Sequence, residues 1–423
     1  MKKFPLRFFM VIAISFMLQG CVKDRLQSTY TYFLPVYKSK AEVLQNINSA
    51  TPQPLKSTGK IFLYGNYIFI NELNKGVHII DNANPLAPKN ISFINIPGNI
   101  DIAVKDNTLY ADLYTDMITI DIADPANVAV KKVTQKVFPE RDYINGFLPD
   151  STRYIVDWLK KVTTDKKEME ISRSLGWPMV WFDSNSMAQN ASGSKAGVAG
   201  VGGSMARFTI VNNYLYTVGS ASLTAFNISS ANEPVKMNVK QLGWNIETIY
   251  PFKDKLFIGA QTGMFIYSIT DPANPSFLGN FSHACFNDPV IADDNYAYVT
   301  LRATTNVTPC RGAVAAQRNE LDIVNISNVL RPALVKIYDM AEPKGLSKDG
   351  DHLFICDGKA GLKIYNVANV LNLKLLHTIN TINPFDVICQ AGLAIVVADE
   401  GIFQYDYSNI SNIKLISKIT IDK

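Results

Sequence analysis

Five charged side chains share one place in the chain, because each lies five to seven residues before a turn predicted from its polar residues. They are Asp101, Glu247, Asp288, Lys344 and Asp386. Carboxylates that converge destabilise one another and need a partner. Trp244 lies three residues before Glu247 and offers a stacking face. The set predicts a polar-ligand or cation site if the fold gathers it, and solvated strand ends if it does not.

Other catalytic patterns are missing from the sequence. The four histidines, His78, His283, His352 and His377, fall at unrelated positions, and none has metal-ligand spacing to cysteine. No P-loop, dinucleotide fingerprint or G-x-S-x-G motif follows a strand pattern. We therefore predict no cofactor, no bound metal and no identifiable catalytic residue. An enzyme using paired carboxylates as acid and base on a sugar or other polar small molecule stays the alternative.

The first 20 residues have the features of an export signal. Lys2, Lys3 and Arg7 precede an apolar run at 8–18, which is too short to span a bilayer. The run ends in Leu-Gln-Gly-Cys, which resembles the lipobox of bacterial lipoproteins and implies lipidation of Cys21. An ordinary cleaved signal is the alternative. Residues 21–58 then form a tether, with a short helix at 38–46.

A unit of about 40 residues recurs seven times. Its clearest part is a short apolar strand that ends in Asp, Asn or Ser, at residues 81, 121, 227, 268, 325, 366 and 406. Short polar residues follow three positions later and favour a turn. Proline follows seven positions later in four units, where it suits the start of an edge strand. Each unit therefore predicts four short strands, which cannot bury their faces alone.

Radial stacking of such units gives an all-β fold, a propeller of seven four-stranded blades over residues 59–423. The segment Leu-Asp-Ile-Val-Asn at 321–325 makes the repeat resemble the LVIVD-repeat family, a largely uncharacterised bacterial propeller family with secreted members. An open β-solenoid or two sandwiches are the alternative folds.

Two insertions interrupt the repeat, at about 139–205 and 303–320. Apolar spacing at 154–162 predicts a helix in the first, which is either a binding element or an ornament on the rim, and residues 191–204 predict a flexible loop. An eighth, degenerate blade is a further alternative there. Cys285 and Cys310 could form a disulfide that ties down the second insertion. Cys356 and Cys389 lie in apolar strands and are predicted to be buried thiols.

Charge removes one class of partner. The 41 basic and 37 acidic residues give a net charge of +4, but three basic residues belong to the export signal, leaving +1. This near-neutral balance gives no reason to expect a nucleic acid. We predict a monomeric outer-membrane lipoprotein, facing the periplasm or the cell surface, whose rigid propeller binds a protein or glycan. A scaffold without a specific ligand is the third hypothesis.

Overall fold

The computed structural model describes residues 30–139, 141, 152–163, 200–243, 245–283, 289–303 and 318–422. These residues form two compact units. Within the described chain, the smaller unit consists of residues 30–36 and 157–163, and the larger unit holds the rest. Predictions that concern residues 1–20, Cys21, Trp244, Asp288, Cys285 and Cys310 lie outside the described residues.

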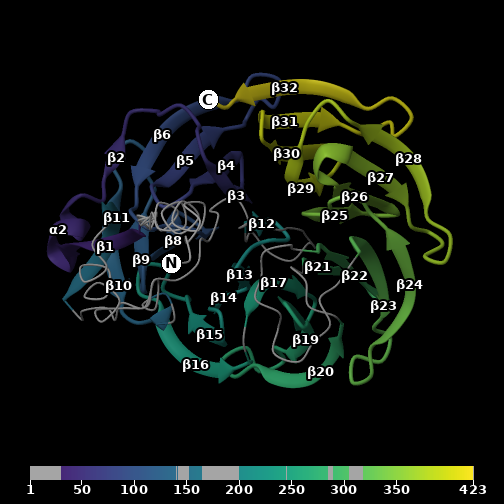
Figure 1. Cartoon of the computed structure of the whole chain (residues 1–423), viewed down its shortest axis with the longest axis horizontal. Helices are drawn as coiled ribbons and strands as arrows, with labels where there is room; N and C mark the ends of the chain where they lie inside the picture. Colours follow the sequence, from purple (N-terminus) through teal and green to yellow (C-terminus); the bar gives the residue numbers. More distant parts are fainter. Residues whose placement is uncertain are drawn as a thin grey trace, which may run out of the picture. The chain divides into compact units, whose positions relative to one another are not determined.

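The larger unit contains seven four-stranded antiparallel sheets in a ring (Figure 1). Blade 1 contains β3 (Thr58–Tyr64), β4 (Tyr67–Glu72), β5 (Gly76–Asp81) and β6 (Lys89–Asn95). Blade 2 contains β7 (Ile102–Lys105), β8 (Thr108–Leu113), β9 (Asp116–Asp121) and β10 (Ala129–Thr134). Blade 3 contains β13 (Phe208–Val211), β14 (Tyr214–Val218), β15 (Ser222–Asn227) and β16 (Val235–Gln241). In every blade, the strands pair in chain order.

The remaining blades repeat this order. Blade 4 contains β17 (Ile246–Phe252), β18 (Lys255–Ala260), β19 (Gly263–Ser268) and β20 (Ser276–Ser282). Blade 5 contains β21 (Val290–Ala292), β22 (Tyr296–Leu301), β23 (Glu320–Asn325) and β24 (Ala333–Asp339). Blade 6 contains β25 (Leu346–Asp349), β26 (His352–Cys356), β27 (Leu362–Asn366) and β28 (Lys374–Ile379). Blade 7 contains β29 (Pro384–Gln390), β30 (Leu393–Ala398), β31 (Gly401–Asp406) and β32 (Lys414–Thr420).

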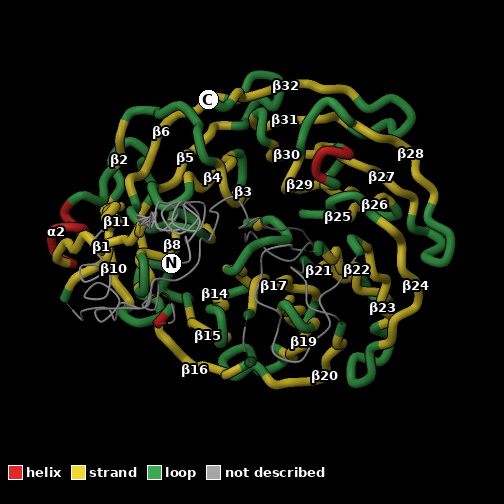
Figure 2. The backbone as a smooth tube through the Cα atoms, viewed as in Figure 1, coloured by secondary structure: helices red, strands yellow, loops and turns green. Residues whose placement is uncertain are grey.

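A few elements lie outside this scheme. The first sheet gains two short strands, β2 (Ser49–Ala50) beside β6 and β12 (Val201–Gly202) beside β3. The helices are short: α2 (Lys40–Gln45), which lies inside the segment expected to be helical, and the 3₁₀ turn η3 (Gly358–Ala360). Figure 2 shows how strands and turns dominate the chain. The prediction of an all-β propeller with seven blades is confirmed.

The helix predicted at 154–162 is wrong, because this segment is the strand β11 (Arg153–Thr163). It pairs with β1 (Tyr30–Ser39) in a two-stranded sheet. Its β-branched residues, such as Val156 and Val162, favour an extended chain. Tyr154, Val156 and Trp158 also alternate with period two, so a strand can hold them on one face. The segment fits both a helical spacing and a period-two alternation. Pairing with β1, which lies more than 100 residues earlier, is what makes it a strand.

The turn chemistry explains why the repeat is visible in sequence. At the end of each third strand, a side-chain oxygen accepts the backbone N–H two residues later, as in Asp81 with Ala83 at 2.9 Å. The same bond forms in all seven blades, at Asp81, Asp121, Asn227, Ser268, Asn325, Asn366 and Asp406. The chain then enters the outermost strand, immediately after Pro88, Pro234, Pro275 and Pro332 in four blades.

The core lies between adjacent blades. The second and third strands are buried almost throughout, and one apolar cluster runs across blades 1, 2 and 3. Cys356 and Cys389 are buried free thiols in the cluster between blades 6 and 7, as predicted. Each blade is thus covered on both faces by its neighbours, and the ring has to close for the first and last blades to be covered.

Closure uses side chains and one short backbone contact, and within the described residues no strand is exchanged between blades. Leu55 forms a parallel bridge with Ile421, and the Asp422 N–H donates to the Leu55 carbonyl at 2.8 Å. Leu55 is 2% exposed and packs with isoleucines of blades 1 and 7. The amides of Asn82 and Gln404 also bond reciprocally, at 3.0 and 2.7 Å. A buried leucine and an amide pair therefore join the two ends of the ring.

Replacing Leu55 with alanine should open this junction. Loss of a fully buried leucine costs about 2–5 kcal/mol of unfolding free energy. The matched control is Leu86→Ala, because Leu86 is a leucine 66% exposed in a turn of blade 1, and it should cost less than about 0.5 kcal/mol. Chemical denaturation measures both. Equal, small effects of the two substitutions would contradict this account of closure.

Candidate functional site

The structure places four of the predicted site residues at the first strands of their blades. Asp101 precedes β7, Glu247 lies in β17, Lys344 precedes β25 and Asp386 lies in β29. Trp244 and Asp288 are outside the described residues, so their part of the predicted site stays a prediction. The four described residues differ sharply in burial and in their partners.

Asp101 is a buried, bonded carboxylate. Its Oδ2 atom lies 2.7 Å from the Lys60 ammonium and also accepts the backbone N–H of Arg207. Its Oδ1 atom accepts the N–H of Ile102 at 2.7 Å. Burial raises the pKa of Asp101 and lowers the pKa of Lys60, and each charge opposes the shift of the other. Asp101 is 2% exposed, and these bonds give its carboxylate a structural role at the start of β7.

Asp386 is completely buried. Its Oδ1 atom accepts the N–H of Val387 at 2.9 Å, whereas Oδ2 has no hydrogen-bond partner among the described residues. Burial raises the pKa of this carboxyl well above its usual range. A group so enclosed does not face an open mouth, and it does not contribute a solvent-accessible carboxylate to a ligand site.

A segment of the first insertion occupies the centre of the ring. Residues 200–207 bond to first strands of several blades: Gly203 N–H to Ile61 at 3.0 Å, and Ile249 N–H to Ala206 at 2.9 Å. The Leu346 N–H donates to Ser204 Oγ at 3.2 Å. Blades 1, 4 and 6 are thereby tied together through this segment. The described end of the predicted flexible loop is therefore packed, and that prediction is wrong for residues 200–204.

Glycine is required where this segment approaches blade 1. A Cβ atom on Gly200 would lie 2.0 Å from the ring of Phe62 and 2.6 Å from the Leu63 carbonyl. Ser204 is fully buried, and Met205 and Ala206 are nearly so. The glycine-rich composition thus serves close packing of backbone on an aromatic ring, and not only chain flexibility.

Glu247 and Lys344 are only partly buried, and both are paired. Gln261 donates to Glu247 Oε1 at 3.0 Å, and Lys344 lies 3.1 Å from Glu342. Burial lowers the pKa of Arg302, while Glu342 and Glu247 oppose that shift. The two carboxylates, Glu247 and Glu342, are thus balanced by two cations, Lys344 and Arg302. They differ from Asp101 and Asp386, which are buried.

A second repeated set of carboxylates was missed in the sequence. Each lies at or just after the end of the second strand and accepts backbone N–H groups from the linker that leads into the first strand. Glu72 accepts from Lys56 and Ser57, at 3.1 and 2.8 Å, and Glu400 accepts from Asn383 at 3.0 Å. Asp112 and Asp357 make the equivalent bonds in blades 2 and 6. We call Glu72, Asp112, Asp357 and Glu400 the linker carboxylates.

A sequence signal for three of these residues exists. Glu72, Asp112 and Asp357 each lie nine residues before the last residue of the repeat strand, at 81, 121 and 366. Each also has a cation nearby, as Asp357 has Lys363 at 2.5 Å. The spacing was available, but its meaning depends on N–H groups 15 residues or so away that no local pattern reveals.

Glu72 shows how strongly such a carboxylate is held. Burial alone would raise its pKa, but a hydrogen bond to His78 and the two N–H donors outweigh burial and lower the pKa to about 2. The His78 Nε2 atom lies 3.2 Å from Glu72 Oε2, with the imidazole fully buried. This places His78 in a structural role.

Asp322 of β23 titrates differently. Burial and the nearby Glu320 raise its pKa to about 7, and His283 opposes that shift. Its Oδ1 atom has no hydrogen-bond partner among the described residues. The pKa of Asp322 therefore lies well above that of a free aspartate.

Metal and membrane features are limited within the described residues. There, no group of three or more His, Cys, Asp or Glu side chains has the geometry to hold a metal ion. In the same part of the chain, no helix is long and apolar enough to cross a membrane.

The fold and its repeat define the class of protein. The chain is a seven-bladed β-propeller built from four-stranded blades. It carries LVIVD repeats: the profile of that repeat matches residues 56–92, in blade 1, and residues 313–340, which include the last two strands of blade 5. No curated protein matches the sequence.

Solved structures share the fold at low identity. Sqt1 of Saccharomyces cerevisiae is 8% identical, with a TM-score of 0.51 over 89% of each chain. A protein from Lactobacillus plantarum is 10% identical, with a TM-score of 0.50 over 86% of this chain and 97% of that one. The computationally designed Ika8 protein is 9% identical, with a TM-score of 0.50 over 86% and 88%. These similarities show the fold alone.

Replacing Glu72 with glutamine tests the linker carboxylates. A folded-state pKa of about 2, against 4.5 for the free group, stabilises the fold above pH 4.5, and the stabilisation is lost as pH falls toward 2. Wild type should therefore exceed Glu72→Gln by about 3 kcal/mol at neutral pH, and the difference should shrink toward pH 2. The exposed Glu42 is the control, since Glu42→Gln should change stability by less than about 0.5 kcal/mol. Chemical denaturation at several pH values measures the difference in unfolding free energy. A difference that does not change with pH would contradict the proposed role of Glu72.

Proposed function

We propose that this protein is a cell-envelope lipoprotein, anchored by lipid on Cys21, whose propeller is a rigid interaction platform for a partner protein. The export signal and the Leu-Gln-Gly-Cys segment support the anchor. The closed ring, with a chain segment bonded across its centre, supports rigidity. The proposed location is the outer membrane. The lipid anchor is compatible with a propeller that faces either the periplasm or the cell surface.

One observation supports the platform: the outermost strand of blade 3 exposes several apolar side chains. Val235, Met237 and Val239 lie along β16 and are 54%, 44% and 40% exposed, and the register of β16 against β15 shifts at Met237. Figure 1 places β16 on the circumference of the ring. Contiguous exposed apolar residues mark interaction surfaces on soluble proteins.

The backbone of β16 adds to this argument. β16 is an edge strand, because it pairs only with β15 in its sheet. Edge strands present unpaired N–H and C=O groups to which another strand can pair. A partner strand laid along β16 would satisfy those groups and cover the three apolar side chains. An extended segment of a protein suits this surface better than a glycan, which brings little apolar area.

The enzyme alternative has less support. It requires two accessible carboxylates in a deep cleft. Asp101 and Asp386 are buried, and Asp101 is bound to Lys60. The backbone N–H of Arg207 also donates to the Asp101 carboxylate. Acid and base chemistry at that position would need a rearrangement of these contacts.

The first test changes β16. Chemical cross-linking in intact cells, followed by mass spectrometry, should capture a protein with wild type, and Met237→Lys with Val239→Lys should reduce that capture by about tenfold or more. Leu415→Lys is the matched control, because Leu415 is exposed on the outermost strand β32 of blade 7 and its change should leave capture intact. The same proteins captured by all three forms would contradict a β16 platform.

The second test concerns the anchor. Labelling with a fatty-acid analogue should modify the wild-type chain and should fail with Cys21→Ser, because the thiol is the attachment point. The variant should also leave the membrane fraction, since acyl chains supply the membrane affinity. Persistence of both label and membrane association in Cys21→Ser would contradict the proposed anchor.

A further inference from the structure

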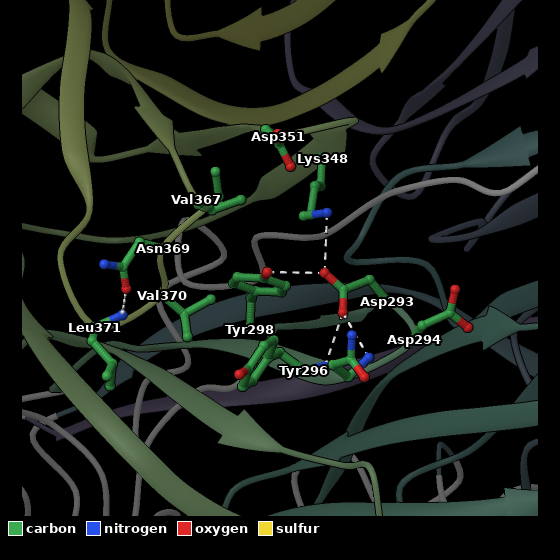
Figure 3. Close-up of a pocket in the computed structure, with 12 residues that line it drawn as sticks. Asp293, Asp294, Tyr296, Tyr298, Lys348, Asp351, Val367, Asn369, Val370 and Leu371 are labelled. Atoms are coloured by element: carbon green, nitrogen blue, oxygen red, sulfur yellow. Dashed lines mark hydrogen bonds and ion pairs between the residues drawn. The ribbon is translucent and has the colours of Figure 1, made fainter.

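A cavity of about 430 Å³ lies between blades 5 and 6, away from the first-strand residues described above. It is lined by the turn between β21 and β22, the end of β25, and the turn between β27 and β28. Figure 3 shows Tyr296 and Tyr298 along one side, with Lys348 and Asp351 on another. Two other junctions in the ring carry a tyrosine contact that differs at this junction.

Two other junctions are closed by a tyrosine of the second strand. Tyr110 donates to the Ala231 carbonyl in the following blade at 2.7 Å, and Tyr216 donates to the Pro272 carbonyl at 2.8 Å. Both carbonyls lie four residues after the end of the repeat strand. By the same count, Tyr298 should donate to Val370.

Tyr298 does not make that bond. Its hydroxyl donates to Asp293 Oδ2 at 2.9 Å, and the Val370 carbonyl accepts from Tyr338 of β24 at 2.8 Å. Tyr298 is thus held within its own blade, while a different tyrosine supports the turn of blade 6. Tyr338 therefore makes the contact that a second-strand tyrosine makes at the two other junctions, and Tyr298 and Val370 both line the cavity.

Asp293 organises the polar wall. Its Oδ2 atom also lies 3.0 Å from Lys348, and its Oδ1 atom accepts the N–H groups of Asn295 and Tyr296 at 3.0 and 2.9 Å. Burial would raise the pKa of Asp293, but these N–H groups and the Lys348 charge outweigh it and lower the pKa. Asp293 is therefore a saturated, charged anchor that fixes the positions of Lys348 and Tyr298.

The groups left for a ligand are of mixed character. Among the described residues, the Asp351 carboxylate, which lines the cavity, has no hydrogen-bond or ion-pair partner, and Lys348 has three donors, of which the bond to Asp293 uses one. Tyr296 is half-buried, and Val370 and Leu371 supply apolar surface. A hydrogen-bond acceptor (Asp351), a donor (Lys348) and an aromatic ring (Tyr296) thus line the same cavity.

These groups select a class of ligand. Three carboxylates against one ammonium line the space, so an anion is disfavoured. Lys348 blocks the position beside Asp293 that a divalent cation would need, and Asp294 is paired with Lys253. A hydroxyl-bearing ring satisfies both a carboxylate and an ammonium through hydrogen bonds, and its C–H face packs on an aromatic ring. The size falls in the range of small-molecule pockets.

We propose that the junction of blades 5 and 6 is a binding site for a neutral sugar, with Asp351 accepting from ring hydroxyls, Lys348 donating to them and Tyr296 packing against the ring. The site deepens the proposed role as an interaction platform by adding a glycan subsite, and it lies on different strands from the β16 surface. Either of the two can fail without the other.

Saturation-transfer NMR with glucose, galactose and glucuronate tests the site on the folded chain lacking residues 1–21. A neutral hexose should show saturable transfer, and glucuronate should bind more weakly because of its carboxylate. Asp351→Ala should raise the dissociation constant of the hexose by about tenfold or more, because a charged hydrogen-bond acceptor is lost. Ala368→Trp, which places a large side chain on a lining turn residue, should abolish binding.

The matched control is Asp254→Ala. Asp254 occupies the same turn position in blade 4, since its carbonyl accepts from Ile269 as that of Asp351 accepts from Val367. It should bind sugar like wild type, and melting temperatures should show that all variants are folded. The proposal is overturned if no hexose shows saturable transfer, if glucuronate binds more tightly than glucose, or if Asp351→Ala and Ala368→Trp bind like wild type. Cross-linking at β16 reports separately on the protein platform.

Discussion

Each blade of this propeller has two apolar faces that only neighbouring blades can cover, and the whole architecture depends on that constraint. A four-stranded sheet of about 40 residues cannot bury its own faces. The apolar clusters accordingly cross blade boundaries, as the cluster of blades 1, 2 and 3 does. The first and last blades face the same requirement, which explains why Leu55 and Ile421 meet at the closure. No exchanged strand is needed, because the closing contact supplies both apolar area and backbone hydrogen bonds.

The same packing forces the chain to account for its polar backbone groups. Linkers that enter a buried first strand carry partly buried N–H groups, and an unpaired buried group is costly. The linker carboxylates Glu72, Asp112, Asp357 and Glu400 accept from these groups in four blades. The turn residues at the ends of the third strands accept exposed N–H groups and so fix the turns. The repeat in sequence is therefore largely a record of backbone hydrogen-bonding requirements.

That origin explains what sequence alone could predict. Turn residues such as Asp81 and Asn366 act on an N–H two positions away, so their spacing revealed seven units and the fold. Asp101 looked like a ligand residue because its partner, Lys60, lies 41 positions earlier in another blade. The strand β11 looked helical because β1, its partner, is distant in the chain. Interactions between residues close in sequence could be predicted, whereas contacts between blades or between distant strands could not.

Departures from the repeat show where specificity arises in such a protein. Identical blades would give seven equivalent junctions, and none would distinguish one ligand from another. Here residues 200–207 bond to the first strands of blades 1, 4 and 6, and the two surfaces that we propose for binding lie instead at β16 and at the junction of blades 5 and 6. At the junction of blades 5 and 6, the exchange of a Tyr298 contact for a Tyr338 contact keeps the turn of blade 6 supported while opening a polar cavity. The fold tolerates this exchange because the Tyr298 hydroxyl donates to Asp293 instead. Asp293 accepts from four donors in total.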